Sequence, residues 1–164
     1  MQNDYIMRVI VQFVQALTSI ARKRKEGHYK EAAEAVKTAS RHYLRTDIDT
    51  LFWTHTPDQV VDSFKDFTDH LDTERCVLFA DLLCELALIY EAEQKLEDTL
   101  HFKIAALHLY AVGIPKEVAF QSPQYFEKVK LLIQELRIQT FSEKVLESLL
   151  CYQQFLSTAS KIKV

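Results

Sequence analysis

Glycine is almost absent from this chain: Gly27 and Gly113 are the only two among 164 residues. Phosphate-binding loops, dinucleotide-binding fingerprints and β-hairpin turns all need glycine, either where φ is positive or where the backbone must approach a ligand closely. None of these motifs occurs in the sequence. Abundant Ala, Leu, Glu and Lys, with only three prolines, favour helix instead. We therefore expect an all-α protein with a single domain over residues 1–164.

The formal net charge of −3 is unevenly distributed along the chain. Residues 1–45 carry nine basic and four acidic side chains, residues 46–100 carry three and fourteen, and residues 101–164 carry eight and five. This balance gives no general reason to expect nucleic acid or an anionic membrane as a partner. The acidic middle could pair with the basic ends, in the same chain or in a second subunit, or it could be solvated surface.

The cysteines and the N-terminus favour a cytoplasmic protein. Cys76, Cys84 and Cys151 lie within apolar helical patterns and form no CxxC motif, which indicates buried thiols in a reducing compartment rather than a zinc or redox site. Residues 1–4 lack the basic segment of a signal peptide, and the uncharged run at 9–21 is too short to span a bilayer.

Apolar periodicity and capping residues predict about seven helices. Thr56-Pro57-Asp58-Gln59 and Thr140-Phe141-Ser142-Glu143 read as capping boxes, Asp72 or Thr73 as an N-cap, and Ser122-Pro123 as another helix start. The predicted ranges are about 4–26, 28–44, 57–71, 74–93, 96–112, 123–136 and 140 to the tail, with a short helical piece at 48–53. Short connections between them favour antiparallel hairpins.

A helical repeat is visible in the spacing of small and aromatic residues. Its turn and second helix follow the pattern of a tetratricopeptide repeat (TPR) at Gly27, Tyr29, Ala32, Val36 and Ala39. Roughly two repeats of 34 residues later, Leu86-Ala87-x-x-Tyr90 resembles the first-helix part of the same motif, with Ala106-Leu107 at the matching later position. The sequence departs from the motif at Gln94, Thr99 and Lys103. The resemblance implies TPR-like antiparallel hairpins in a short right-handed array.

The first 45 residues also resemble the opening of an uncharacterised family of small helical bacterial proteins, mostly from Firmicutes. The resemblance rests on Asp4-Tyr5-Ile6-Met7-Arg8, on Gln15-Ala16-Leu17 and on the segment from Arg24 to Ala32. It implies a TPR-like fold in the cytoplasm. It brings no activity and no functional residue to this chain.

TPR-like arrays bind peptides or helices in a concave groove lined by the first helix of each pair. By alignment with the motif, Val14 belongs to this face, and the candidate groove residues are Leu17, Ala21, Arg24, Asp81, Cys84, Glu85, Leu88 and Glu91. Asp81 with Glu85 would favour a basic or amine-bearing ligand. The apolar positions could instead be core residues or a self-association surface.

Two clusters suggest a metal site as the alternative. Asp62, Asp66, Asp69 and His70 would share one face of the predicted helix 57–71 and could hold a divalent cation, unless they form a solvated stripe. A second cluster comprises Glu97, Asp98, His101 and His108, but Asp98-x-x-His101 matches the ferritin-type pattern only once.

No residue pattern in the sequence indicates an activated catalytic nucleophile. Cys84 lies near Asp81 and Glu85, which would raise the pKa of its thiol. We therefore expect a protein-interaction or scaffold module without catalytic residues, cofactor or bound metal, whose partner is a protein or peptide and not nucleic acid or membrane. The alternative is a small helical-bundle metal-binding protein or enzyme that uses the acidic and histidine residues of the central helices.

The first helix is apolar around nearly its whole circumference. Twelve apolar residues lie between Tyr5 and Ala21, whereas the helix at 28–44 can cover only one side. Either the C-terminal helix folds back over the remainder or a second copy packs there, and twofold dimers are the commonest symmetric solution. We expect a homodimer whose interface includes Ile6, Ile10, Phe13 and Val14.

Overall fold

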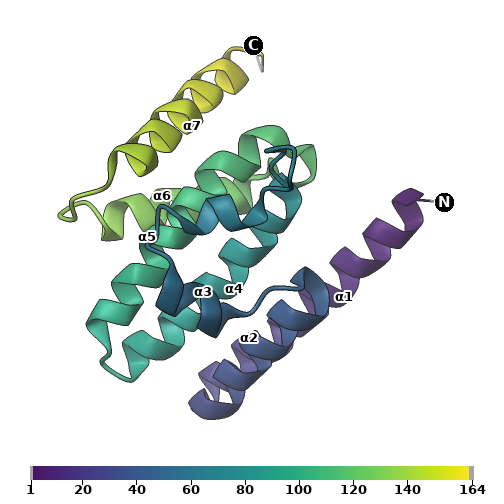
Figure 1. Ribbon diagram of the computed structural model, residues 1–164, viewed down its shortest axis with the longest axis vertical. Coiled ribbons are helices and arrows are strands. Elements are labelled where there is room, and N and C mark those ends of the chain that lie inside the picture. The colour runs from purple at the N-terminus through teal and green to yellow at the C-terminus, as the bar shows by residue number, and fades with distance from the viewer. Residues whose placement is uncertain (1, 163–164) are drawn as a thin grey trace.

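The computed structural model describes residues 2–162 and is built from helices joined by short connections (Figure 1). Within these residues, seven α-helices form, and the only extended pairing is an isolated bridge between Lys65 and Leu71. The α-helices are α1 (Gln2–Lys25), α2 (Tyr29–Leu44), α3 (Ile48–Thr54), α4 (Thr73–Ala92), α5 (Leu96–Gly113), α6 (Pro123–Glu135) and α7 (Glu143–Ile162). Three short 3₁₀ turns are η1 (Val60–Phe64), η2 (Ile114–Lys116) and η3 (Val118–Phe120). The all-α prediction is confirmed.

Capping and turn residues account for most helix boundaries. The carboxylate of Asp72 accepts a hydrogen bond from the backbone N–H of Arg75 and begins α4, and Ser122 begins α6 in the same way through Tyr125. Gly27 has φ +82° in the turn between α1 and α2, a conformation that side chains other than glycine resist. These residues were recognised in the sequence, and the corresponding helices begin or end within two residues of the predicted positions.

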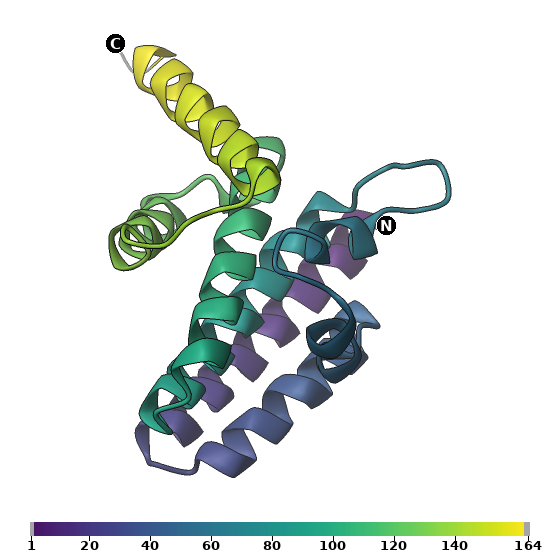
Figure 2. The ribbon, with the colours of Figure 1, turned by 60° about the vertical axis from the view of Figure 1, so that its left-hand side comes forward.

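The α4–α5 hairpin lies at the centre of the molecule. α4 packs against α5, α2 and α1, while α5 also packs against α6 and α7 (Figures 1 and 2). Gly113 ends α5 where the two helices approach closely, because a Cβ atom there would lie 2.5 Å from Cγ2 of Val77 and 2.9 Å from the carbonyl oxygen of Thr73. Both helices of the hairpin are therefore buried on several sides.

The predicted helix 57–71 does not form. The backbone N–H of Thr56 does donate to Oε1 of Gln59 at 3.0 Å, as in a capping box, but only the single 3₁₀ turn η1 follows. Beyond it, Oδ1 of Asp66 accepts hydrogen bonds from the backbone N–H groups of Thr68 and His70 and closes a tight turn. Asp69, with φ +62°, lies in that turn. This local bonding competes with helix continuation.

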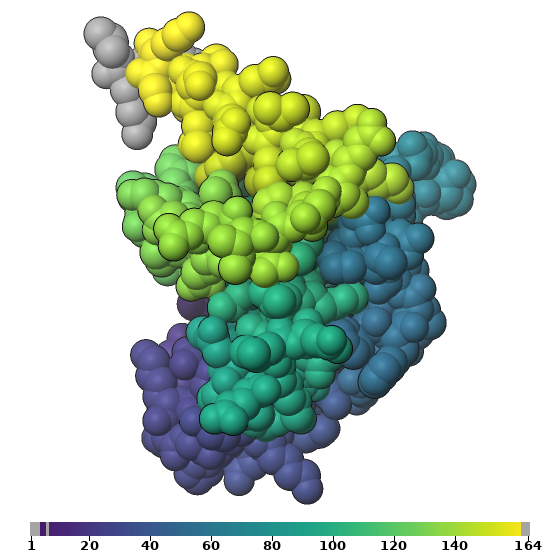
Figure 3. Space-filling model, turned by 90° about the vertical axis from the view of Figure 1, so that its left-hand side faces the viewer, coloured from purple at the N-terminus to yellow at the C-terminus, as the bar shows by residue number. Residues whose placement is uncertain are grey.

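The two terminal helices lie on opposite sides of the central hairpin (Figure 1). α7 packs on α5, and its Phe155 stacks near Phe126 of α6, so α6 and α7 form one end of the molecule and the α1–α2 hairpin the other (Figure 3). The sequence left two candidates to cover α1, the C-terminal helix and a second copy. The prediction that the C-terminal helix covers α1 is therefore wrong, because the apolar face of α7 packs against α5 and α6. Among the described residues, every helix is too short or too polar to cross a membrane.

Candidate interaction groove

A groove of about 670 Å³ runs between α1, α4 and α6. α1 forms one wall, α4 the floor and α6 the opposite wall, so three helices separated in sequence contribute side chains to one surface. The residues that line it include Val14, Leu17 and Ala21 from α1, Asp81, Cys84, Glu85 and Leu88 from α4, and Tyr125, Lys128, Leu131 and Glu135 from α6. We call this surface the groove.

Six of the eight groove residues predicted from the sequence line this surface: Leu17, Ala21, Asp81, Cys84, Glu85 and Leu88. The other two, Arg24 and Glu91, lie at the margin of the groove, where each forms an ion pair with a residue that lines it. Nε of Arg24 is 2.8 Å from Oε2 of Glu85, and Oε1 of Glu91 is 3.2 Å from Nζ of Lys103, which itself lines the groove. Sequence reasoning missed the wall formed by α6.

Asp81 is buried in the floor of the groove, with 3% of its surface exposed. Its carboxylate accepts hydrogen bonds from the hydroxyls of Tyr110 at 2.5 Å and Tyr125 at 2.7 Å, and from Nζ of Lys128 at 3.0 Å. Burial, with Asp81 as the nearest charge, raises the pKa of both tyrosines, which therefore stay protonated as donors. The chain itself supplies three donors to this carboxylate.

The remaining charges along the groove are also paired within the chain. Glu85 pairs with Arg24, and Lys103 pairs with Glu91 and with Glu135 at 3.0 Å. The burial of Lys103 lowers its pKa, but the two glutamates outweigh that effect and the pKa is raised. The expectation that Asp81 and Glu85 favour a basic ligand is therefore wrong, because both carboxylates already have cationic partners.

Between the paired charges, the surface of the groove consists of exposed apolar side chains. Val14 is 51% exposed, Leu88 38% and Leu131 48%, although all three are large apolar residues that folding normally buries. Since the ionic groups around them are paired, a ligand in the groove would meet apolar surface at its centre and balanced charge at its edges.

The thiol of Cys84 is a poor nucleophile. Burial, with smaller contributions from Asp81 and Glu85, raises its pKa to about 12, although a contact of 3.7 Å with the hydroxyl of Tyr110 acts in the opposite direction. A thiol with this pKa is protonated at neutral pH. Burial raises the pKa of Cys76 to about 12 as well.

The acidic cluster predicted on helix 57–71 does not converge. Asp62 pairs with Lys65 at 3.2 Å and with Lys144 at 3.4 Å, and Asp69 pairs with the same Lys65 at 3.2 Å. Asp66 bonds to backbone N–H groups in the turn. Among the described residues, no three His, Cys, Asp or Glu side chains are placed to hold a metal ion.

The histidines of α5 lie in separate packing environments. Nδ1 of His108 is 2.9 Å from the hydroxyl of Ser148 on α7, whereas the ring of His101 packs against Phe52 with centroids 4.7 Å apart. Burial lowers the pKa of both imidazoles. Neither is joined to Glu97 or Asp98 in a ligand set.

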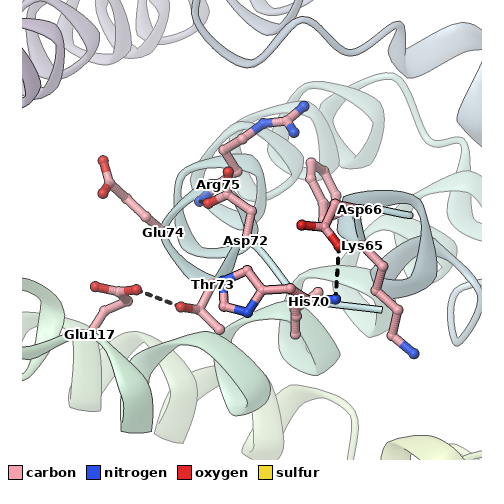
Figure 4. A pocket seen from close by; sticks show the side chains of 10 residues that line it. Lys65, Asp66, His70, Asp72, Thr73, Glu74, Arg75 and Glu117 are labelled. Atoms are coloured by element: carbon pink, nitrogen blue, oxygen red, sulfur yellow. Dashed lines mark hydrogen bonds between the residues drawn. The ribbon is translucent and has the colours of Figure 1, made fainter. Parts of the chain in front are cut away.

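A second hollow of about 390 Å³ lies where the turn after η1 meets the start of α4 (Figure 4). Polar side chains in this hollow form hydrogen bonds with other residues of the chain. The hydroxyl of Thr73 donates to Glu117 at 2.5 Å, and Arg75 donates to the carbonyl of Leu44. In Figure 4, the side chains of Glu74 and Lys65 point away from one another. This arrangement does not gather groups around a common point.

The predicted dimer-interface residues differ in their availability. Phe13 is fully buried and packs edge-to-face on Tyr43 of α2, with centroids 5.8 Å apart, so it is a core residue of the chain that also borders the groove. Ile10 is partly buried and Val14 is exposed, and both line the groove. The side chain of Ile6 lies outside the described residues.

No protein-family model, curated protein or solved structure matches the chain.

Proposed function

We propose that this chain is a protein-interaction module of the TPR-like type, which binds the apolar face of a helical protein segment in the groove. One observation carries the proposal: the groove exposes large apolar side chains while its charged groups are paired within the chain. Monomeric proteins rarely leave such a surface in water unless it is used for binding. The helix-in-groove mode matches an apolar channel bounded by helices.

The TPR-like part of the proposal rests on sequence spacing and on element order. α1 with α2 and α4 with α5 are successive antiparallel hairpins, and α1 and α4, the first helices of the two, both face the groove. In this proposal α6 corresponds to a third first helix. This arrangement agrees with the motif residues around Gly27 and Tyr90.

Binding rather than catalysis is favoured by the chemistry of the groove. Its buried carboxylate accepts hydrogen bonds from three donors of the chain and its cysteine is held as a thiol. The proposal includes a cytoplasmic location, because all three cysteines are free thiols, as expected in a reducing compartment.

A display library of short random peptides, selected on the full chain, tests this function. We expect enriched sequences to carry apolar residues at i, i+3 or i+4, and i+7, with few charges. Their affinity should fall at least about tenfold when Leu131→Asp places a charge in the groove wall. Leu146→Asp is the matched control, since Leu146 on α7 is also 48% exposed but lies outside the groove.

Two results would contradict the function. One is a selection that enriches no sequence. The other is a set of peptides that bind the wild type and Leu131→Asp equally well, because the binding surface would then lie elsewhere. Circular dichroism of both variants establishes that they keep the helical fold.

A further inference from the structure

The N-terminal part of α1 extends beyond its partner helix. α1 has 24 residues and α2 has 16, and the two run antiparallel from the turn at Gly27. The first eight or so residues of α1 therefore pass the end of α2 by about 12 Å at 1.5 Å per residue. Figure 1 shows this end of α1 projecting from the body of the molecule.

An exposed apolar stripe begins in this projecting segment. Met7 is 58% exposed, Val11 51% and Val14 51%, and their spacing of i, i+4 and i+7 places them on one face of the helix. Tyr5, beside them, is 68% exposed. The stripe continues along α1 to Leu17 and Ala21, which line the groove. The uncovered stripe and the groove are thus one continuous apolar surface.

We infer that two copies of this chain associate about a twofold axis, each placing the N-terminal part of its α1 in the groove of the other. The inference rests on the proposed function, since the groove must accept an apolar helix. It names the occupant: residues 4–14 of a second copy. Each copy then supplies side chains to its partner's groove, and each covers the stripe that its own chain leaves in water.

The charge distribution along α1 favours this antiparallel arrangement. α1 carries Asp4 in its first turn and the basic run 22–25 in its last turn. If the twofold axis passes near Val14, the partner subunit's Asp4 comes level with Arg24, and the partner subunit's Met7 comes level with Ala21. Opposite charges then meet at both ends of the paired helices, as do the opposite poles of the two helix dipoles.

The same register accounts for apolar residues on the other two helices. The partner subunit's Met7 would lie towards the end of the groove marked by the Arg24–Glu85 ion pair, where Leu88 follows Glu85 by one turn of α4. Across the groove, Leu131 lies between Lys128 and Glu135 on α6. Direct packing of two α1 helices, away from the groove, would leave Leu88 and Leu131 exposed.

Sedimentation equilibrium of the full chain at micromolar concentration is the test. We expect about twice the chain mass of 19.1 kDa. Met7→Asp, which alters the inserted helix, and Leu131→Asp, which alters only the receiving groove, should each raise the dimer dissociation constant at least about tenfold. Leu146→Asp should leave it unchanged. Asp4→Lys should weaken the dimer at low salt, with the difference disappearing at high salt.

Mixing the two variants gives a sharper result. Neither Met7→Asp nor Leu131→Asp retains an intact helix–groove contact with itself, but a mixed dimer retains one. We therefore expect the mixture to associate more tightly than either variant alone.

A wild-type monomer would overturn the inference, and so would loss of the dimer in Met7→Asp without loss in Leu131→Asp. Neither result affects the proposed function, which the peptide selection decides separately. If Leu131→Asp abolishes peptide binding while the dimer persists, the groove binds foreign helices only and the inference fails.

Discussion

α1 and α4 are apolar around most of their circumference, yet the structure uses them differently. Twelve residues of α4 are buried, whereas Phe13 and Ile20 are the only fully buried residues of α1 among those whose side chains are described. α4 has α1, α2 and α5 as neighbours, while α1 at the end of the array has α2 and part of α4. An apolar circumference predicts that a helix will be covered, but its position in the array decides whether its own chain provides the cover.

The largest expected difference between the two helices concerns their apolar side chains. Leu86→Ala in α4 should lower the free energy of unfolding by about 3 kcal/mol, because Leu86 is 1% exposed and its loss leaves a cavity. Val11→Ala in α1 should change it by less than about 0.5 kcal/mol in the monomer. Urea denaturation measures both, and equal losses would show that α1 is covered as completely as α4.

The two glycines give a second contrast. Gly113→Ala should destabilise the chain by about 2 kcal/mol, because the new methyl group would collide with Val77 and the backbone of Thr73 in the central hairpin. Gly27→Ala should lose about 1 kcal/mol, since no atom lies within 4 Å of the new methyl group and only the positive φ is strained. Chemical denaturation that reverses this order would contradict the close approach of α4 and α5.

The carboxylate of Asp81 joins the central hairpin to α6. Asp81→Asn should lower the free energy of unfolding by about 1.5 kcal/mol, because the amide has one accepting oxygen in place of two and cannot accept from Tyr110, Tyr125 and Lys128 together. Glu85→Gln is the control, since its ion pair with Arg24 is more exposed and its loss should be smaller. Equal effects in thermal denaturation would mean that the buried network adds nothing.

The smallest expected effect is a dependence of stability on pH that arises in α5. Burial lowers the pKa of His101 and His108 in the folded state, so the unfolded chain binds more protons as the pH falls. The free energy of unfolding should therefore decrease between about pH 7.5 and about pH 5.5.

His108→Asn isolates the contribution of one histidine to that slope. Asn can still hydrogen-bond to Ser148 but does not titrate, so the decrease in stability between the two pH values should become smaller. A slope equal to that of the wild type would show that His108 is not the group responsible.

Helix positions could be predicted from the sequence where a short-range signal fixes them. Asp72, Ser122 and Gly27 each act on backbone groups within four residues, so the boundaries that depend on them were predicted closely. The segment 57–71 also has helical periodicity, but the side chain of Asp66 bonds to backbone N–H groups in a turn and stops the helix. Periodicity does not reveal that competition.

The groove was only partly predictable for a related reason. Spacing within α1 and α4 identified six of its residues, because each helix presents one face. The contacts of Asp81 with Tyr125 and Lys128 join residues 44 and 47 positions apart, and no local pattern encodes them. The mistaken preference for a basic ligand followed from missing Lys128 as the partner of Asp81 and Arg24 as the partner of Glu85.

The central claim is that the stripe on α1 and the groove are two halves of one contact between copies. Amide hydrogen exchange, followed by mass spectrometry at low and high protein concentration, tests it most directly. Peptides from residues 2–17 of α1 and from α6 should gain protection together as concentration rises, while α2 and α7 stay unchanged. Protection that appears on α1 without α6, or on neither, would contradict the account.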